Sequence, residues 1–273
     1  MASQLRRGGG RPRPRPSRDR RAGHTTEQVE GRQAVRELLR ARKRRVRQLW
    51  IAADAEPSPV LDEIEDLASG LGFAPRRTSG SRVDAMARTD APQGVVAIAD
   101  PLPEADFDAL LDDPHAFLVA LDGVTDPRNL GSIIRSAEGA GATGIVLPRH
   151  RAAGVGPTAA KAAAGAIEHV PIAHVAGIPS ALDRASRHGV WTVGLDESGA
   201  SSLFDLDLGD RPVLLALGAE GHGLARLTAK RCDLLVHIPM HGAIASLNVS
   251  VAAALACYEV ARTRGDSLTG PPE

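Results

Sequence analysis

From residue 116 to residue 262, short apolar segments alternate with segments in which apolar residues recur at helical spacing. The short runs predict buried strands, and the segments between them predict helices. This alternation is typical of a mainly parallel sheet covered by helices, whose ligands bind in loops beyond the carboxyl ends of the strands. The expected strands are residues 116–121, 144–147, 171–174, 190–195, 213–217 and 234–238, and the expected helices are 130–139, 158–164, 178–188 and one from residue 246 onward.

The chain before residue 100 shows the same alternation on a smaller scale. Ala34, Val35, Leu38 and Leu39 form one helical stripe. Further helices are expected at 59–71 and 81–87, and strands at 49–52 and 94–99, which together predict a small α/β domain. We therefore expect a tail at 1–24, a small α/β domain at 25–100, a linker with one helical turn at 101–113, and a second domain at 114–273.

Charge is unevenly distributed along a chain whose net charge is zero. Residues 1–50 hold sixteen Arg and Lys against four acidic residues, and residues 51–273 hold seventeen against twenty-nine. Residues 1–24 are rich in Arg, Pro and Gly, which predicts a disordered tail. This tail and the basic cluster at 42–47 indicate a polyanion such as RNA as the partner, and a solubilising tail is the alternative.

The sequence carries no sign of a metal site or a membrane segment. Cys232 and Cys257 form no C-x-x-C pair, and the nine histidines show no ligand spacing. No apolar run reaches the length of a membrane span, and the first residues lack the apolar core of a signal peptide. We expect a cytoplasmic protein with reduced cysteines, no metal and no membrane partner.

Four loops carry polar or glycine residues of the kind that line ligand sites. The first, at 122–135, follows a buried strand and contains Asn129, with Arg135 on the helix that comes next. A permanently charged, planar guanidinium suits a phosphate or a carboxylate. The alternative for Arg135 is an ion pair with Glu138 one turn further on.

The second and third loops are defined by glycines. The loop at 218–224 follows an apolar strand and has three glycines around Glu220, which permits close approach of a ligand to the backbone. In the loop at 161–171 a glycine interrupts an otherwise good helix. The segment GAGATG at 139–144 has the spacing G-x-G-x-x-G, but it follows a helix and precedes a strand, so we interpret it as a helix stop and turn.

The fourth loop lies before the final helix, within residues 238–262. Ser246 and Asn248 are both good N-cap types at the point where that helix would begin. The pattern predicts a capped helix that packs on the sheet, with apolar residues at helical spacing at Leu247, Val251, Leu255 and Tyr258.

Three of these segments, in this order, resemble the signature motifs of one enzyme family. DPRNLGSIIRSAEGAG, LGAEGHGL and IPMHGAIASLNVSVAAALACYE are similar to the motifs of the SpoU/TrmH family, RNA ribose 2′-O-methyltransferases of the SPOUT or α/β-knot class. VEGRQAVRELL and PQGVVAIA resemble the start and end of an auxiliary RNA-binding domain related to ribosomal proteins. Together with KAAAGAIEHVP, they favour the bacterial branch that methylates a guanosine of 23S ribosomal RNA.

The resemblance implies a trefoil knot in the second domain, a homodimer, RNA as substrate and S-adenosylmethionine as cofactor. It places Gly218, Ile238 and Leu247 at the cofactor. The positions that it ties to catalysis or to substrate placement are Asn129, Arg135, Glu220, Ser246 and Asn248.

The expected reaction is an in-line attack of a ribose 2′-hydroxyl on the methyl group of the cofactor, and it needs no metal. Arginine stays protonated, so our hypothesis is that Arg135 holds the target phosphate and lowers the pKa of the hydroxyl. Asn129, Ser246 and Asn248 would orient the ribose, and Glu220 would fix Arg135 or a neighbouring loop. The alternatives are a guanosine of tRNA, a ribosomal RNA site that confers antibiotic resistance, or a non-catalytic role in RNA binding or ribosome assembly.

Overall fold

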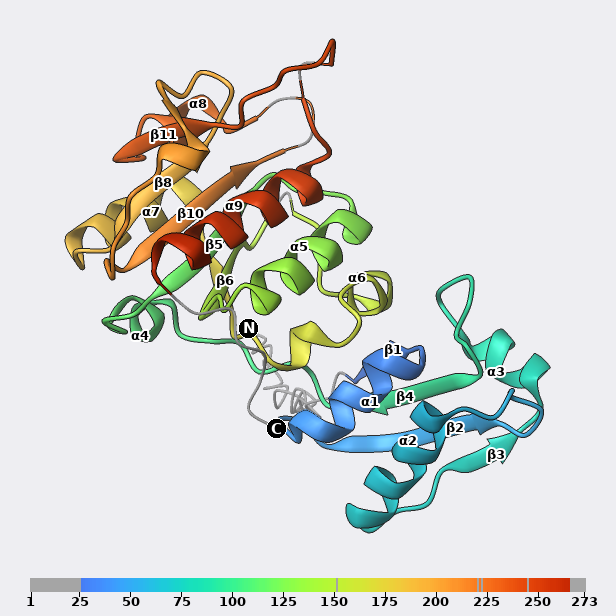
Figure 1. The fold of residues 1–273 in the computed structure, drawn as a ribbon. Coiled ribbons are helices and arrows are strands. Elements are labelled where there is room, and N and C mark those ends of the chain that lie inside the picture. Colours follow the sequence, from blue (N-terminus) through green and yellow to red (C-terminus); the bar gives the residue numbers. More distant parts are fainter. Residues whose placement is uncertain (1–25, 151, 220, 222, 245, 266–273) are drawn as a thin grey trace, which may run out of the picture.

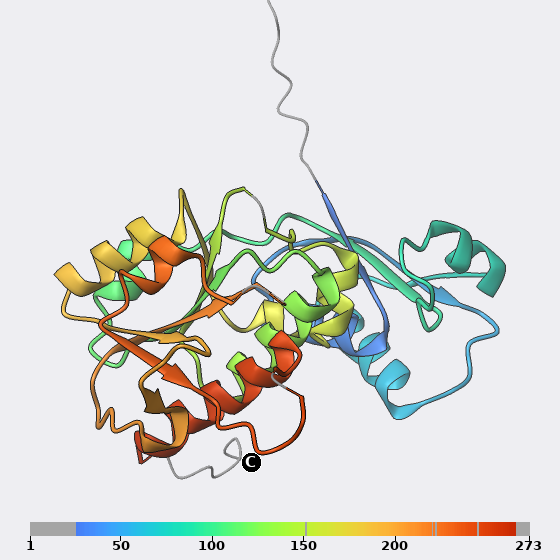
Figure 2. The same ribbon diagram turned by 90° about the horizontal axis from the view of Figure 1, so that it is seen from above.

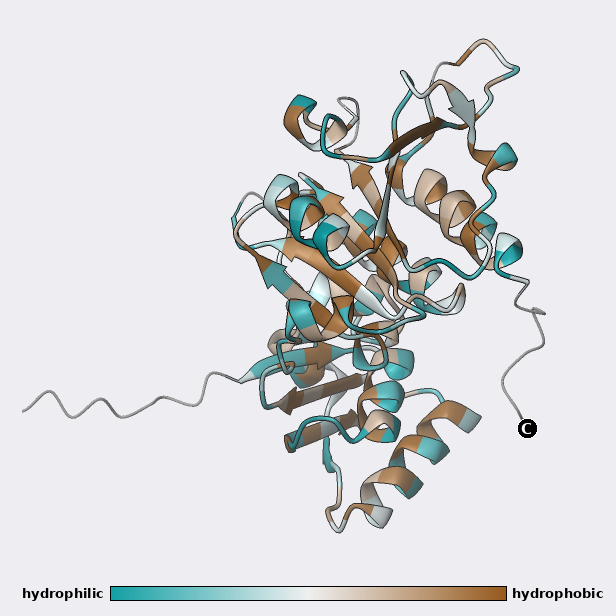
Figure 3. Ribbon diagram, turned by 90° about the vertical axis from the view of Figure 1, so that its left-hand side faces the viewer, coloured by the Kyte–Doolittle hydropathy of each residue, from teal (hydrophilic) through white to brown (hydrophobic). Residues whose placement is uncertain are grey.

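The computed structural model describes residues 26–150, 152–219, 221, 223–244 and 246–265, so the expected tail at 1–24 lies outside the described residues. Two separate sheets, each with its own helices, make up this part of the chain (Figure 1). Figure 3 shows the strands as mostly hydrophobic and the outer helix faces as mixed or hydrophilic. None of the described helices combines the length and the apolar character that crossing a bilayer requires.

The first sheet has four strands in the order β1-β4-β2-β3, with β3 parallel to β2 and the other pairs antiparallel. The predicted stripe of α1 is confirmed, because Ala34, Val35, Leu38 and Leu39 are all buried against this sheet. The short strands β1 and β3 were not predicted. The elements are β1 (Glu27–Glu30), α1 (Arg32–Ala41), β2 (Val46–Ala52), α2 (Pro59–Gly70), β3 (Arg76–Thr78), α3 (Gly80–Met86) and β4 (Val95–Ala99).

The segment expected to be a linker packs against the second sheet. The backbone amide of Ala105 donates to the carbonyl of Ile172 at 2.9 Å. Helix α4 (Phe107–Leu111) supplies the expected helical turn, and its Phe107 and Leu111 are buried in the core of the second sheet. The segment that connects the two domains is therefore anchored on the second sheet by an aromatic and an aliphatic side chain.

The second sheet has seven parallel strands in the order β7-β6-β5-β10-β8-β11-β9, which confirms the predicted fold class. The trefoil knot depends on chain threading, which strand order does not define, and it stays a prediction. The elements are β5 (Phe117–Asp122), α5 (Pro127–Gly139), β6 (Gly144–Pro148), α6 (Pro157–Ala162), η1 (Ala166–Glu168), β7 (Ile172–Val175), α7 (Ile178–Arg187), β8 (Trp191–Leu195), β9 (Ser201–Ser202), η2 (Leu203–Asp205), β10 (Val213–Gly218), α8 (Arg226–Ala229), β11 (Leu234–His237) and α9 (Val249–Thr263).

The glycine-rich segment after α5 is a helix stop, as predicted. Helix α5 ends at Gly139, Gly141 has φ +82°, and β6 begins at Gly144. A left-handed glycine just past a helix end is the usual way to stop a helix. This segment therefore forms a turn between α5 and β6, and not a dinucleotide-binding loop.

Helix α9 forms as predicted, but its apolar stripe faces outward. The residues expected to pack are exposed: Leu247 is 37%, Val251 49%, Leu255 37% and Tyr258 44% exposed. The face that packs on α5 and β10 is made of smaller side chains, which let the helix approach closely. These buried residues include Val249, Ala253, Ala256, Cys257, Val260 and Ala261.

Candidate active site at the carboxyl ends of the second sheet

A pocket of about 310 Å³ lies at the carboxyl ends of β8, β10 and β11. It is built by loops that are far apart in sequence but follow strands that are close together in the sheet. This is the edge at which parallel sheets bind ligands. The lining residues are 195–197, 217–219, 221, 223, 238, 240, 246, 247, 249 and 252.

The glycine loop after β10 is closed by its own backbone. The amides and carbonyls of Ala219 and Gly223 pair with each other at 3.0 and 3.1 Å. A β-carbon on Gly218 would lie 2.0 Å from the carbonyl carbon of Gly223, so only glycine fits. Gly221 has φ +76°, a conformation that side chains rarely adopt. Gly218 thus lines the pocket, and its contact with the cofactor stays a prediction, while Glu220 and His222 lie outside the described residues.

The segment before α9 forms the opposite wall. Ile238, Ser246 and Leu247 all line the pocket. Asn248 is the N-cap of α9, and its side-chain oxygen accepts from the backbone amide of Ser250 at 2.8 Å. Of the two expected cap residues, Asn248 therefore caps the helix and Ser246 faces the pocket.

Asn248 also joins this segment to the first loop. Its side-chain amide donates to the side-chain oxygen of Asn129 at 3.2 Å, across 119 positions of sequence. Asn129 sits in the first turn of α5, a helix that Asp126 caps by accepting from the amide of Arg128 at 2.8 Å. The structure therefore brings the first and third motifs together at one point.

Arg135 lies further along α5 and is exposed, outside the residues that line the pocket. Within the described ranges, no carboxylate lies within 4 Å of its guanidinium, so the alternative ion pair with Glu138 does not form there. Its charge faces solvent. This is the arrangement that a phosphate-binding arginine needs.

The loop after β8 supplies two carboxylates that were not predicted. Asp196 and Glu197 both line the pocket, and Asp196 accepts from the backbone amides of Ser198 at 3.0 Å and of Leu224 at 3.4 Å. Burial raises the pKa of Asp196, but the hydrogen bonds from Ser198 and Leu224 outweigh it, so the pKa lies below its ordinary value. Acidic residues directly after a buried strand were the signal that could have identified this loop.

The loop at 161–171, also singled out from the sequence, does not reach the pocket, because its residues lie on the side of α5 that faces the first sheet. In the described part of the chain, no three His, Cys, Asp or Glu side chains are grouped in a way that could hold a metal ion.

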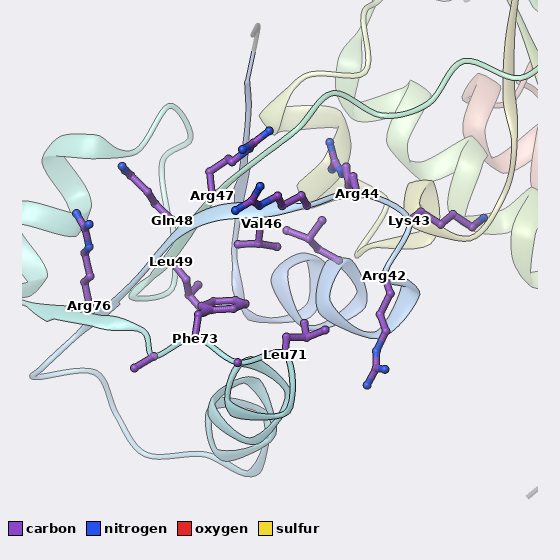
Figure 4. Close-up of a pocket in the computed structure, with 14 residues that line it drawn as sticks. Arg42, Lys43, Arg44, Val46, Arg47, Gln48, Leu49, Leu71, Phe73 and Arg76 are labelled. Carbon is purple, nitrogen blue, oxygen red and sulfur yellow. The ribbon is translucent and has the colours of Figure 1, made fainter.

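A second cavity, the basic groove, lies on the first sheet and has a volume of about 650 Å³ (Figure 4). Figure 4 shows Leu71 and Phe73 on one side of the groove and Arg44 and Arg47 on the other. No acidic side chain is among its lining residues, which are described throughout. It is lined by Leu38, residues 42–49, residues 71–74 and Arg76.

The cationic residues of the basic groove differ in their availability. Arg44 is buried in an ion pair with Glu168, and Arg47 pairs with Asp100 at 2.6 Å. Arg42 and Arg45 are exposed, and no described carboxylate lies within 4 Å of either guanidinium. The expectation that the whole cluster at 42–47 grips RNA is therefore wrong for Arg44, which is a structural residue.

Comparisons with known proteins agree with this geometry. A model described as the SpoU rRNA methylase family matches residues 116–258, and one described as RNA 2′-O ribose methyltransferase substrate binding matches residues 28–105. The TrmH family protein YacO of Bacillus subtilis is 39% identical over 241 residues, which cover 86% of this chain and 95% of YacO. The 23S rRNA (guanosine-2′-O-)-methyltransferase RlmB of Pseudomonas aeruginosa is 37% identical over 243 residues, which cover 87% of this chain and 97% of RlmB.

Solved structures give the same result. The SpoU methyltransferase AviRb from Streptomyces viridochromogenes, crystallised in complex with AdoMet, superposes with a TM-score of 0.73 at 29% identity. The superposition covers 90% of this chain and 94% of AviRb. One family model alone covers more than half of this chain, and residues of the second and third motifs line one pocket while Asn129 of the first motif is hydrogen-bonded to Asn248 of the third. This chain belongs to the SpoU/TrmH family of RNA 2′-O-methyltransferases.

Proposed function

We propose that this enzyme methylates the 2′-hydroxyl of a guanosine in 23S ribosomal RNA, with S-adenosylmethionine as the methyl donor. One observation carries the proposal: three distant segments converge beside one pocket, where the Asn129–Asn248 hydrogen bond adjoins the glycine loop and the wall that contains Leu247. The name of the Pseudomonas aeruginosa relative supports ribosomal RNA and guanosine as the target.

The pocket suits S-adenosylmethionine in size and in chemistry. Its volume of about 310 Å³ lies within the range of about 300–1,000 Å³ of small-molecule sites. Ile238 and Leu247 offer an apolar surface to an adenine ring, Glu197 offers a carboxylate to hydroxyl or ammonium groups, and Gly218 opens the backbone to close approach. The AviRb complex with AdoMet supports this assignment. When bound, the cofactor supplies a methyl group on a positively charged sulfur.

The side chains beside the pocket have the chemistry to position a ribose. Asn129 and Asn248 hold each other, which restricts both amides, and Ser246 offers a hydroxyl on the pocket wall. Arg135 would bind the phosphate of the target nucleotide, and its fixed positive charge would lower the pKa of the 2′-hydroxyl. The role of Glu220, which is not described, stays a prediction. Positioning of this kind is the main source of rate in a displacement between bound groups.

The basic groove is the surface of the first domain that best fits RNA. The guanidinium groups of Arg42 and Arg45 have no described carboxylate within 4 Å. The guanidinium carbon of Arg76 lies 6.0 Å from the ring centre of Trp50. Leu71 and Phe73 add apolar area on which an unstacked base could lie. Cationic side chains over an apolar floor are typical of sites for single-stranded RNA.

The exposed stripe on α9 supports a homodimer. Val251, Leu255 and Tyr258 project from one helix face and are 49%, 37% and 44% exposed, although the Tyr258 hydroxyl reaches the carbonyl of Gly139 in α5, and Leu247 extends this face to the pocket. An exposed row of large apolar side chains on a helix commonly marks a protein interface. A second copy placed on this face would also cover the entrance of the pocket near Leu247.

We also retain the division into a tail at 1–24, an RNA-binding domain at 25–100, a linker at 101–113 and a methyltransferase domain at 114–273. The two separate sheets and their separate hydrophobic cores support it.

The target is tested by mapping 2′-O-methylated nucleotides in cells that lack the protein. We expect one guanosine of 23S ribosomal RNA to lose its methyl group, and the plasmid-borne gene to restore it. Loss from a tRNA guanosine instead would support the second candidate target. Unchanged methylation, together with no binding of S-adenosylmethionine on a calorimeter, would leave only a non-catalytic role.

A further inference from the structure

The segment KAAAGAIEHV, which runs from the end of α6 through η1 toward β7, makes several contacts with the first domain. The ammonium of Lys161 donates to the carbonyl of Ala91 at 2.6 Å. The ring Nε2 of His169 lies 2.9 Å from a carboxylate oxygen of Glu37, and the ammonium of Lys43 donates to the carbonyl of His169 at 2.7 Å. Residues at both ends of this segment are therefore hydrogen-bonded to the first domain.

The centre of this contact is a buried ion pair. The side chains of Arg44 and Glu168 are 2% and 1% exposed, and the guanidinium Nε donates to one oxygen of Glu168 at 3.1 Å while an Nη donates to the other. The second Nη of Arg44 donates to Glu27 at 2.6 Å. Burial raises the pKa of Glu168, and Arg44 opposes that shift. Such a pair is tolerated only where both partners stay in place, because either one alone is an uncompensated buried charge.

Gly165 permits the backbone of this segment to touch α1. Its φ is +94°, and a β-carbon there would lie 2.4 Å from the β-carbon of Glu37. Any other residue would be strained and would also push the first domain away. Gly165, the glycine that interrupts the helical pattern, therefore lies where the backbone of this segment is in close contact with α1 of the first domain.

The opposite side of this segment is packed on the helix that bears the site residues. A β-carbon on Gly131 of α5 would lie 2.3 Å from the carbonyl oxygen of Ala159 in α6, so these two helices are in direct contact. Figure 2 shows the yellow-green α6 and η1 between the blue α1 and the remainder of the second domain. A packed path thus runs from α1 through α6 and η1 to α5, which carries Asn129 and Arg135.

We propose that residues 161–169 form a docking clamp that fixes the RNA-binding domain on the methyltransferase domain, so that RNA held by the first domain reaches Arg135 at one set distance. The inference rests on the proposed function, because it assumes that the first domain holds the substrate. The clamp residues are positioning residues, because none of residues 161–169 lines the pocket or the basic groove; their partners Lys43 and Arg44 do line the groove.

A fixed placement of the two domains should affect kcat/KM for RNA. Linking two binding sites makes the second contact intramolecular, and its effective concentration is highest when the linkage matches the span between the sites. Loss of the clamp should therefore lower kcat/KM for RNA, while the affinity for S-adenosylmethionine stays the same. Ala163, Ala166 and Ile167 of the clamp belong to the hydrophobic core of the second sheet, and the first sheet has a core of its own, so the thermal midpoint of each variant must show that both domains remain folded.

The test compares Gly165→Ala with Gly189→Ala. Gly189 has φ +77°, and no atom lies within 4 Å of the place that a β-carbon would take, so its substitution brings similar backbone strain without a clash between domains. Spin labels at Ser69→Cys on α2 and Ser186→Cys on α7 report the distance between the domains, since both positions are exposed. Burial raises the pKa of Cys232 and of Cys257 to about 12, so the native thiols react slowly with the label.

We expect a narrow distance distribution by pulsed electron resonance in the parent and in Gly189→Ala, measured in dimers diluted with unlabelled protein. Gly165→Ala should give a broad one and a kcat/KM for 23S ribosomal RNA at least about tenfold lower. An equally narrow distribution in Gly165→Ala, or equal kinetic losses in both variants, would overturn the clamp. If Gly165→Ala does not fold, Glu168→Gln replaces it with the same criteria. The distance readout needs no activity, so a wrong proposed function would show instead as no methyl transfer by the parent.

Discussion

Replacing Gly218 by alanine should abolish tight binding of the cofactor. The new β-carbon would lie 2.0 Å from the carbonyl carbon and oxygen of Gly223, where ordinary contact is about 3.5 Å, so the loop must move by roughly 1.5 Å. That movement separates the pair of hydrogen bonds between Ala219 and Gly223, each worth about 1 kcal/mol. Together with the lost pocket wall, these changes should weaken the free energy of cofactor binding by about 2–3 kcal/mol. The dissociation constant would then rise roughly 30- to 150-fold.

Isothermal titration calorimetry with S-adenosylmethionine measures this directly. Gly242→Ala is the matched control, because nothing lies within 4 Å of a β-carbon there, and it should bind within about twofold of the parent. Circular dichroism and the thermal midpoint of each variant show whether the fold is intact. Binding by folded Gly218→Ala within about threefold of the parent would refute the placement of the cofactor at this loop.

Four further predictions concern other parts of the molecule. Arg135→Lys should lower single-turnover methyl transfer by at least about tenfold, because an ammonium lacks the planar fork, and a near-parental rate would remove that role. Deletion of residues 1–24 should weaken RNA binding and flatten its dependence on salt, and an unchanged salt series would exclude the tail from RNA contact. Leu255→Asp should turn a dimer into a monomer by light scattering with little change in the thermal midpoint, since Leu255 is 37% exposed in the single chain. Because burial raises the pKa of Glu168, its protonated form stabilises the fold fully below the ordinary pKa of 4.5, and that contribution is lost as pH rises through the raised value. Glu168→Gln leaves Arg44 without this carboxylate and should be less stable than the parent, and the difference in free energy of unfolding should become smaller as pH rises from about 4.5; a difference in urea unfolding that does not change with pH would contradict this.

The sequence was most informative where local pattern decides structure. Strand and helix alternation predicted both sheets, and the residue type at Asn248 predicted its cap, because capping depends on neighbours two or three residues away. Gly218, Ile238, Ser246 and Leu247 followed from the family resemblance, and the structure places all four at one pocket. Their functional roles stay predictions.

Features that depend on distant partners were not predictable. Helical spacing alone could not show which face of α9 is buried, and the small side chains at Ala253 and Ala256 pack against α5 while Leu255 stays outside. The partners Arg44 and Glu168 lie 124 positions apart, so nothing in the basic cluster at 42–47 identified one arginine as structural. Strand order, which brings Asp196 to the pocket beside Gly218, is likewise a property of the whole fold.

Methyl transfer by the purified chain tests the central claim most directly. The protein is incubated with 23S ribosomal RNA and S-adenosylmethionine that carries a labelled methyl group, and the RNA is digested to nucleosides for mass spectrometry. We predict label in 2′-O-methylguanosine from a single site, and much less label with Gly218→Ala at cofactor concentrations that just saturate the parent. Label on a base, or no label with a parent that binds the cofactor, would contradict it.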